Sequence, residues 1–430
     1  MISFKRISTY VFAGFVAQGA AAIAGLLLVR WIPAAEYALY TIAVTMIGTI
    51  STLTRSGPQL GLSGALSEAW PDQDRAARAL ASALQIRLMV SAIVMPLVLV
   101  ATAWLLLKAG TDWPRLAMII GILALIWLAD LKGGLLDQVL FFAQRANRVQ
   151  SLDSSISIGR LVLVVGAKAA GQLSVIVALL TNLYAVAARI PALTRWSREA
   201  LARTRPAEPD PAMQRAMRKV ALRQIPIDLL TVLQAQLAIF FLTDRGGLFE
   251  LATYGALGRI AQLLTPFSAL VMAYFVPAFA GQRDRIVPRL MLFISLSCAP
   301  AVGLALVAWQ APEYLLVFIG QQYADQAWPL FVCALTLIAM GVANTLWAVV
   351  AHRGWNRWAW LRLPIGGLWC FIGPMVLSLD SAASTYLFYC GFSVGTLVSA
   401  LADLVAARRR GEYVALFRRS PEPTAAPNGG

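Results

Sequence analysis

Four arginines lie inside long apolar stretches of the sequence, where a charged side chain needs a partner or a ligand. Arg160 and Arg259 stand near the middle of such stretches, and Arg30 and Arg55 stand near the ends of two others. A guanidinium group is permanently charged and binds phosphate through parallel hydrogen bonds. A charge at the bilayer centre costs ~2.5–3.5 kcal/mol or more, so the pattern predicts a cationic cavity for an anionic ligand. For Arg30 and Arg55 there is an alternative: each lies close enough to a membrane surface for its side chain to extend to lipid headgroups.

Two aspartates lie inside the same kind of stretch. Asp130 and Asp228 each stand about a third of the way into an apolar run. We consider both as candidates for carrying a coupling ion or for providing a counter-charge. One alternative stays open at this point, namely that Arg160 and Arg259 form salt bridges with these two aspartates inside the helix bundle.

The motifs of soluble catalysis and nucleotide hydrolysis do not occur. The sequence contains no phosphate-binding loop of the G-x-x-x-x-G-K type, no H-E-x-x-H and no G-x-S-x-G. Its single histidine and its four cysteines show no metal-ligand spacing. We therefore predict a protein that is not an enzyme, with no catalytic residue, no metal and no cofactor.

The composition is that of an integral membrane protein. The chain is 59% hydrophobic and 13% charged, whereas a soluble domain is about 45–50% apolar and ~25% charged. A transmembrane helix needs ~20 mostly apolar residues. On that rule the sequence predicts twelve spans: 8–30, 36–57, 86–107, 114–136, 152–170, 172–193, 222–243, 250–278, 288–309, 326–350, 357–378 and 384–406.

The distribution of positive charge predicts the orientation. With the N-terminus inside, twenty-eight of the 36 lysines and arginines fall on the inner side, five on the outer side and three within spans. Cytoplasmic loops carry such an excess of cations. Both termini are therefore predicted to be cytoplasmic. A net charge of +15 then indicates anionic phospholipids as partners rather than nucleic acid.

The chain divides into two related halves. The loop 194–221 contains three prolines and separates residues 1–193, a predicted six-helix bundle, from residues 222–407, a second bundle; residues 408–430 form a basic, disordered tail. The segments "EYALY" and "ELATY" begin at Glu36 and Glu250, at the same place in each half. Six spans is an even number, so the repeats are predicted to be parallel.

Several segments resemble a known family of transporters. They are "LLLVRWIPAAEYALYTIAVTMIGTISTLTRSGPQLGLSGAL", "ATYGALGRIAQLLTPFSALVMAYFVPAFA" and "LLVFIGQQYADQAWPLF", in that order along the chain. They are similar to polysaccharide transporters, the Wzx-type lipid-linked oligosaccharide flippases of the multidrug/oligosaccharidyl-lipid/polysaccharide exporter superfamily. Ala38 stands where that family more often has glycine.

The resemblance implies an all-α fold in which two six-helix bundles form a V around a central cationic cavity. It also implies that the protein moves undecaprenyl-diphosphate-linked oligosaccharide across the bacterial inner membrane for O-antigen, capsule or exopolysaccharide synthesis, with polymerase and export machinery as partners. Arg55 is then expected at the inner mouth, where a turn at Gly57–Pro58 ends its helix. Two other functions remain: a drug/cation antiporter of the same superfamily, and a membrane-embedded glycan polymerase.

Overall fold

The computed structural model describes residues 4–202, 207–264, 267, 286–353, 355 and 357–411. Its described part contains helices and turns and no strand. The longer helices are α1 (Phe4–Trp31), α2 (Ala34–Ala69), α3 (Gln73–Lys108), α4 (Trp113–Asp130), α5 (Gly133–Phe142), α6 (Ala146–Ala169), α7 (Val175–Ala187), α8 (Arg189–Ala200), α9 (Pro211–Phe241), α10 (Gly247–Gln262), α13 (Ile286–Gln310), α14 (Glu313–Ile319), α15 (Ala327–His352), α16 (Arg362–Val376) and α17 (Ala382–Arg409).

The protein is a multi-pass membrane protein. Within the described residues, eleven helical segments are long and apolar enough to cross a membrane. One of them, Pro211–Gln262, contains α9 and α10, which a π-helical turn at Leu242–Gly246 separates, so it covers two predicted spans. The second part of the predicted span 250–278, with Pro266 and Pro277, lies outside the described residues, as does most of the tail.

One predicted helix end is wrong. The helix α2 does not stop at Gly57–Pro58 but continues to Ala69, with Pro58 buried inside it. Proline removes one backbone hydrogen bond, and tertiary packing compensates here. A Cβ atom at Gly57 would lie 2.9 Å from the Cα atom of Ala221, so the glycine lets α9 pack closely against α2. The predicted linker 194–221 is also partly helical, since α8 extends into it and α9 begins within it.

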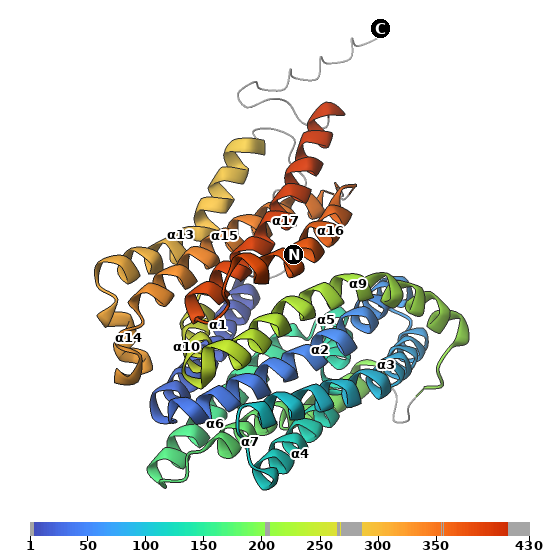
Figure 1. The fold of residues 1–430 in the computed structure, drawn as a ribbon. Helices are drawn as coiled ribbons and strands as arrows, with labels where there is room; N and C mark the ends of the chain where they lie inside the picture. Colours follow the sequence, from blue (N-terminus) through green and yellow to red (C-terminus); the bar gives the residue numbers. More distant parts are fainter. Residues whose placement is uncertain are drawn as a thin grey trace.

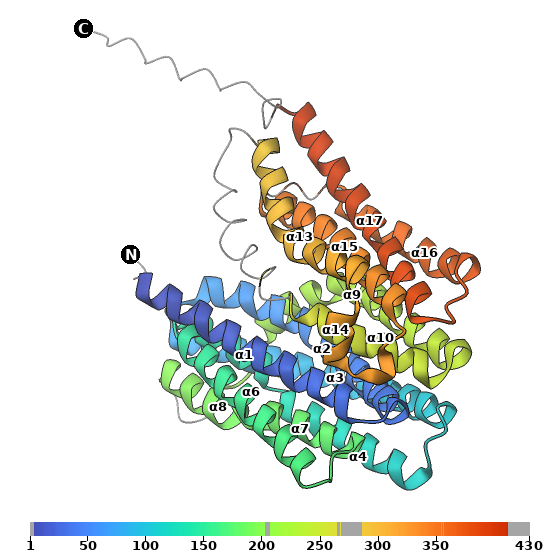
Figure 2. The same ribbon diagram turned by 90° about the vertical axis from the view of Figure 1, so that its left-hand side faces the viewer.

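The helices form two groups that diverge toward one side (Figures 1 and 2). One group contains α1–α8, and the other contains α13, α15, α16 and α17. The helices α9 and α10 connect them, because both pack on α2 while α9 also contacts α16 and α10 contacts α15 and α17. We call the side where α1 begins and α17 ends the terminal face, and the opposite side the distal face. The groups converge toward the distal face, and the exact bundle boundaries stay a prediction.

The shared sequence pattern of the two halves corresponds to a shared contact. On α2, the Glu36 carboxylate accepts a hydrogen bond from the Val175 backbone N–H at the start of α7, at 3.1 Å. On α10, the Glu250 carboxylate accepts one from the Ala382 N–H at the start of α17, at 2.7 Å. Both bonds satisfy an N–H group that has no partner inside its own helix. The repeat is therefore parallel, and it relates α2 to α10 and α7 to α17.

The orientation of these faces in the membrane is testable by fusion. Reporter domains placed after Lys168 and after Asp380 are expected on the outer side, because both residues lie at the distal face, away from most cations. Fusions after Arg205, which lies outside the described residues, and after Arg410 are expected in the cytoplasm. A cytoplasmic reporter signal at Asp380 would contradict both the orientation and the twelve-span topology.

Candidate substrate site between the two halves

Two deep arginines converge on one pair of tyrosines. Tyr37 and Tyr40 lie one turn apart on α2, both fully buried, with ring centroids 5.6 Å apart. Arg259 on α10 donates a hydrogen bond from Nε to the Tyr37 hydroxyl at 3.3 Å, and its Cζ atom lies 5.6 Å from the centre of the Tyr40 ring. Arg160 on α6 donates from Nη2 to the Tyr40 hydroxyl at 3.1 Å. The structure thus brings together Arg160 and Arg259, which the sequence placed at similar depth.

Small residues permit this arrangement. A side chain at Gly255 would overlap Thr41, so glycine at this position lets α10 cross close to α2. The backbone carbonyl of Gly255 accepts a hydrogen bond from the Tyr37 hydroxyl at 3.4 Å. On the other side, a Cβ atom at Gly25 of α1 would lie 3.0 Å from the Arg259 Cδ atom. The Arg259 side chain therefore lies in the space left between α1 and α2.

Neutral groups complete the surroundings of the two arginines. Asn182 on α7 donates to the Tyr40 hydroxyl at 3.1 Å, and Gln262 accepts from Arg259 Nη1 at 3.0 Å. In the described part of the chain, neither Arg160 nor Arg259 forms an ion pair with a carboxylate. Both side chains are only partly buried. The cluster therefore has two positive charges from two halves of the chain, no adjacent counter-charge among the described residues, and hydroxyl groups that orient the guanidinium planes.

Neither candidate aspartate pairs with these arginines. Asp228 is buried on α9 and accepts hydrogen bonds from the Ser56 hydroxyl of α2 and from Gln224 Nε2, the latter at 3.0 Å. Its carboxylate therefore lies at the contact between α2 and α9.

Asp228→Asn is expected to leave the amount of folded protein unchanged, because an asparagine oxygen still accepts from Ser56. Transport is expected to fall by roughly tenfold, since hydrogen bonds to a charged group are worth ~1.5–3 kcal/mol and the α2–α9 contact changes strength. Initial transport rates and membrane abundance, measured in the same preparation, check this. Wild-type rates would remove Asp228 from the mechanism.

Asp130 has a partner that the sequence did not indicate. Arg87 on α3, only 1% exposed, forms a salt bridge with Asp130 at 2.7 Å. Its Nη1 also donates to the backbone carbonyls of Asp130 and Leu131, at 2.8 and 2.9 Å. These carbonyls end α4, so Arg87 stabilises the break between α4 and α5. The helix α3 begins at Gln73, thirteen residues before the predicted span 86–107, so Arg87 lies well inside it.

The other two candidate arginines lie apart from the tyrosine pair. Arg55 packs over Gly134 of α5, where a Cβ atom on that glycine would lie 2.6 Å from the Arg55 Cδ atom. Arg30 is exposed at the distal end of α1 and lines a cavity with Glu313 and Gln322. The structure thus places Arg55 between the two deep arginines and the terminal face, and it separates Arg30 from all three.

A second charge cluster was also missed. Arg189 at the start of α8 contacts Asp137 of α5 at 3.3 Å and Asp153 of α6 at 3.0 Å. The three residues lie far apart in the sequence, and no local spacing connects them. The cluster lies where α7 and α8 join and holds three helices of the first group together.

At the distal face, the first helix group contacts the turn between α9 and α10 and the segment after α14. Lys108 at the end of α3 forms a salt bridge with Asp244, in the turn between α9 and α10. The hydrogen bond from Lys108 lowers the pKa of the exposed Asp244 carboxyl. Gln322 after α14 donates to the Val29 carbonyl of α1 at 3.1 Å. These contacts lie at the distal side, whereas the two groups diverge toward the terminal face (Figure 2).

Comparison with known proteins gives a match by structure alone. No protein-family model matches the sequence, and no curated protein matches it. A multidrug resistance transporter of the MATE family, of the MOP superfamily, in an inward-facing conformation superposes with a TM-score of 0.62 and 16% identity, over 91% of this chain and 94% of that one. The lipid II flippase MurJ, in an inward closed conformation, gives 0.68 and 12%, over 93% and 87%.

A third structure is a MOP superfamily transporter from Pyrococcus furiosus, described as having a binding pocket of reverse polarity. It gives a TM-score of 0.57 and 15% identity, over 94% of this chain and 95% of the other. The chain has the fold of the MOP superfamily transporters. The predicted fold class is thereby confirmed, and the match extends over nearly the whole length of each of these neighbours.

Proposed function

We propose that the protein is a flippase for lipid-linked oligosaccharides that carry an undecaprenyl diphosphate, acting in the bacterial inner membrane. The observation that carries this proposal is the convergence of Arg160 and Arg259 on Tyr37 and Tyr40. A diphosphate is a polyanion, and guanidinium groups bind it with charge-assisted, bidentate hydrogen bonds. Two guanidinium groups that the sequence places at mid-depth, and that form no ion pair among the described residues, supply the charge that such a headgroup needs on its way across.

The transport step follows from the placement of the arginines. Arg55 lies between the deep pair and the terminal face, so a diphosphate entering from the cytoplasm would meet it before it reaches the deep pair. Arg160 belongs to the first half and Arg259 to the second, so a bound diphosphate links the two halves. Closing the terminal side around this ligand, and breaking the distal contacts at Lys108 and Asp244, would release it at the other face.

The charge of the site favours an anion over a cationic drug. A site for lipophilic cations needs acidic groups, because a cation placed between two guanidinium groups is repelled. The two candidate aspartates already have other partners. Asp130 pairs with Arg87, and Asp228 accepts hydrogen bonds from Ser56 and Gln224. The fold therefore allows a MATE-like drug antiporter as the second candidate function, but the positive charge of the site disfavours it. The surface-glycan pathway and a role for polymerase or export machinery belong to the same proposal.

The direct test is deletion of the gene, followed by analysis of surface glycans and of the lipid-linked units in the inner membrane. One surface polysaccharide is expected to disappear, and its undecaprenyl-diphosphate-linked repeat unit is expected to accumulate facing the cytoplasm. Complementation with the wild-type gene should reverse both effects. Unchanged glycans together with increased sensitivity to cationic drugs would instead establish the antiporter.

A further inference from the structure

The two halves carry matching grooves at the terminal face. Ser174 caps the start of α7 and Ser381 caps the start of α17, which relates the two helices by an offset of 207 residues. Asn182 and Tyr389 obey the same offset, and they contact Tyr40 and Tyr254 respectively. The same offset relates two grooves, one of about 680 Å³ along α8 and one of about 550 Å³ along α17. Five of their lining residues correspond in pairs: Thr194 to Leu401, Arg195 to Ala402, Arg198 to Val405, Glu199 to Ala406 and Ala202 to Arg409.

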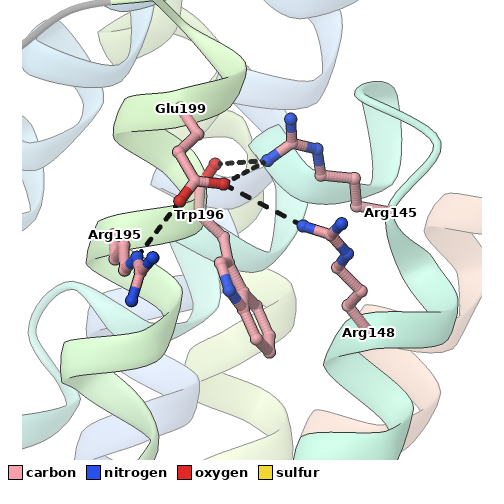
Figure 3. Close-up of polar contacts among 5 residues, drawn as sticks. All are labelled: Arg145, Arg148, Arg195, Trp196 and Glu199. Atoms are coloured by element: carbon pink, nitrogen blue, oxygen red, sulfur yellow. Dashed lines mark hydrogen bonds and ion pairs between the residues drawn. The ribbon is translucent and has the colours of Figure 1, made fainter.

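In the first half, one carboxylate pairs with three arginines at and beside this groove. Glu199 contacts Arg145 at 3.2 Å, Arg148 at 3.9 Å and Arg195 at 3.2 Å (Figure 3). Arg145 also donates to the backbone carbonyl of Trp196 at 3.1 Å. This network connects the turn between α5 and α6 to the end of α8, with its cations held by one shared acid.

In the second half, the carboxylate is replaced by a methyl group. Ala406 occupies the position of Glu199, yet cations remain, because Arg357, Arg409 and Arg410 line the groove. Arg357 and Arg409 form no ion pair within the described residues. Asp403 is buried and already has another partner, since its Oδ1 accepts a hydrogen bond from the Trp358 backbone N–H at 2.8 Å. That bond holds the turn before α16 against α17.

The wall of the second groove is apolar. Leu401 and Val405, which correspond to Thr194 and Arg198, are 48% and 49% exposed. Trp358 lines the same groove, and tryptophan is typical of the membrane–water interface. The groove thus combines an apolar wall on a membrane-spanning helix with cations at the level where that helix ends.

We propose that this groove binds one anionic glycerophospholipid from the leaflet at the terminal face. The lipid phosphate contacts Arg357 and Arg409, and an acyl chain lies along Leu401 and Val405. A soluble anion would leave the apolar wall uncovered, and a zwitterionic headgroup would place its own cation beside the arginines. This site is separate from the tyrosine pair, so the proposal goes beyond the flippase function and does not depend on it.

The test uses the full-length protein in detergent, titrated with phosphatidylglycerol or phosphatidylethanolamine of identical acyl chains and read by native mass spectrometry. Wild-type protein is expected to bind one phosphatidylglycerol in preference to phosphatidylethanolamine. The double variant Arg357→Gln/Arg409→Gln is expected to bind phosphatidylglycerol roughly thirtyfold more weakly, because two headgroup contacts are lost.

The matched control is Arg148→Gln/Arg195→Gln, which removes the same charge from two arginines that pair with Glu199, one lining the first groove and one beside it. We expect it to change phosphatidylglycerol binding by less than about twofold. Equal losses of phosphatidylglycerol affinity in both double variants would show that binding depends on surface charge alone, and would overturn the site. Unchanged binding in Arg357→Gln/Arg409→Gln, or full displacement of the lipid by inorganic phosphate or undecaprenyl diphosphate, would overturn it as well.

Discussion

Arg259→Ala is expected to abolish transport, by roughly 100-fold or more, while the protein accumulates in the membrane at wild-type levels. A hydrogen bond to a charged group is worth about 1.5–3 kcal/mol, and a bidentate contact with phosphate contains two of them. Protein levels should hold because Arg259 contacts neutral groups, Tyr37 and Gln262. Its removal therefore leaves no uncompensated buried charge. Export rate and membrane abundance are measured in the same cells.

Arg259→Lys separates charge from geometry. Lysine keeps the positive charge but loses the planar pair of donors that matches a phosphate. We expect partial transport, between the alanine variant and the wild type, with normal abundance. If both variants lose folded protein, Arg259 is a structural residue. If Arg259→Ala exports normally, the residue does not bind substrate.

Arg87→Met is expected to have the opposite effect. It should lower the free energy of unfolding by about 3–5 kcal/mol and so reduce the amount of folded protein. Arg87 is 1% exposed, and it is the only ion-pair partner of Asp130 among the described residues. Methionine leaves that carboxylate charged and poorly solvated, together with two carbonyls at the break between α4 and α5. Thermal unfolding in detergent and membrane abundance measure the effect.

The control for Arg87 removes the partner as well. In Arg87→Met/Asp130→Leu no charge remains buried, so we expect part of the lost stability to return. If Arg87→Met unfolds at the wild-type temperature, the salt bridge does not hold the α4–α5 break. A single variant that is stable but inactive would instead place Arg87 in the transport path.

The sequence could predict the deep arginines but not what surrounds them. Charge within an apolar run marks Arg160 and Arg259 because burying a guanidinium is unfavourable without a reason. The tyrosines Tyr37 and Tyr40 carry no such signal, because a neutral side chain in an apolar run does not require a counter-charge. Only the repeat of Glu36 and Tyr40 as Glu250 and Tyr254 hinted at their position.

The incorrect helix end and the missed ion pair have a common physical origin. Pro58 was expected to end its helix on a local rule, and nothing near Arg87 in the sequence indicates that it pairs with Asp130. In the structure, close packing on α9 compensates for the proline, and Asp130 with two carbonyls compensates for the arginine. Such compensation comes from helices far away in the sequence. One sequence without aligned relatives contains no record of these contacts, whereas spans and halves follow from composition along the chain.

The central claim, that the tyrosine-linked arginines bind a lipid diphosphate, is tested most directly by binding of undecaprenyl diphosphate to purified protein. Wild type is compared with Arg160→Gln/Arg259→Gln, and Arg148→Gln/Arg195→Gln serves as the charge-matched control. We expect the deep double variant to bind about 100-fold more weakly, the control to bind as the wild type does, and undecaprenyl monophosphate to bind less tightly than the diphosphate. Equal affinity of the deep double variant and the wild type for undecaprenyl diphosphate would contradict the claim.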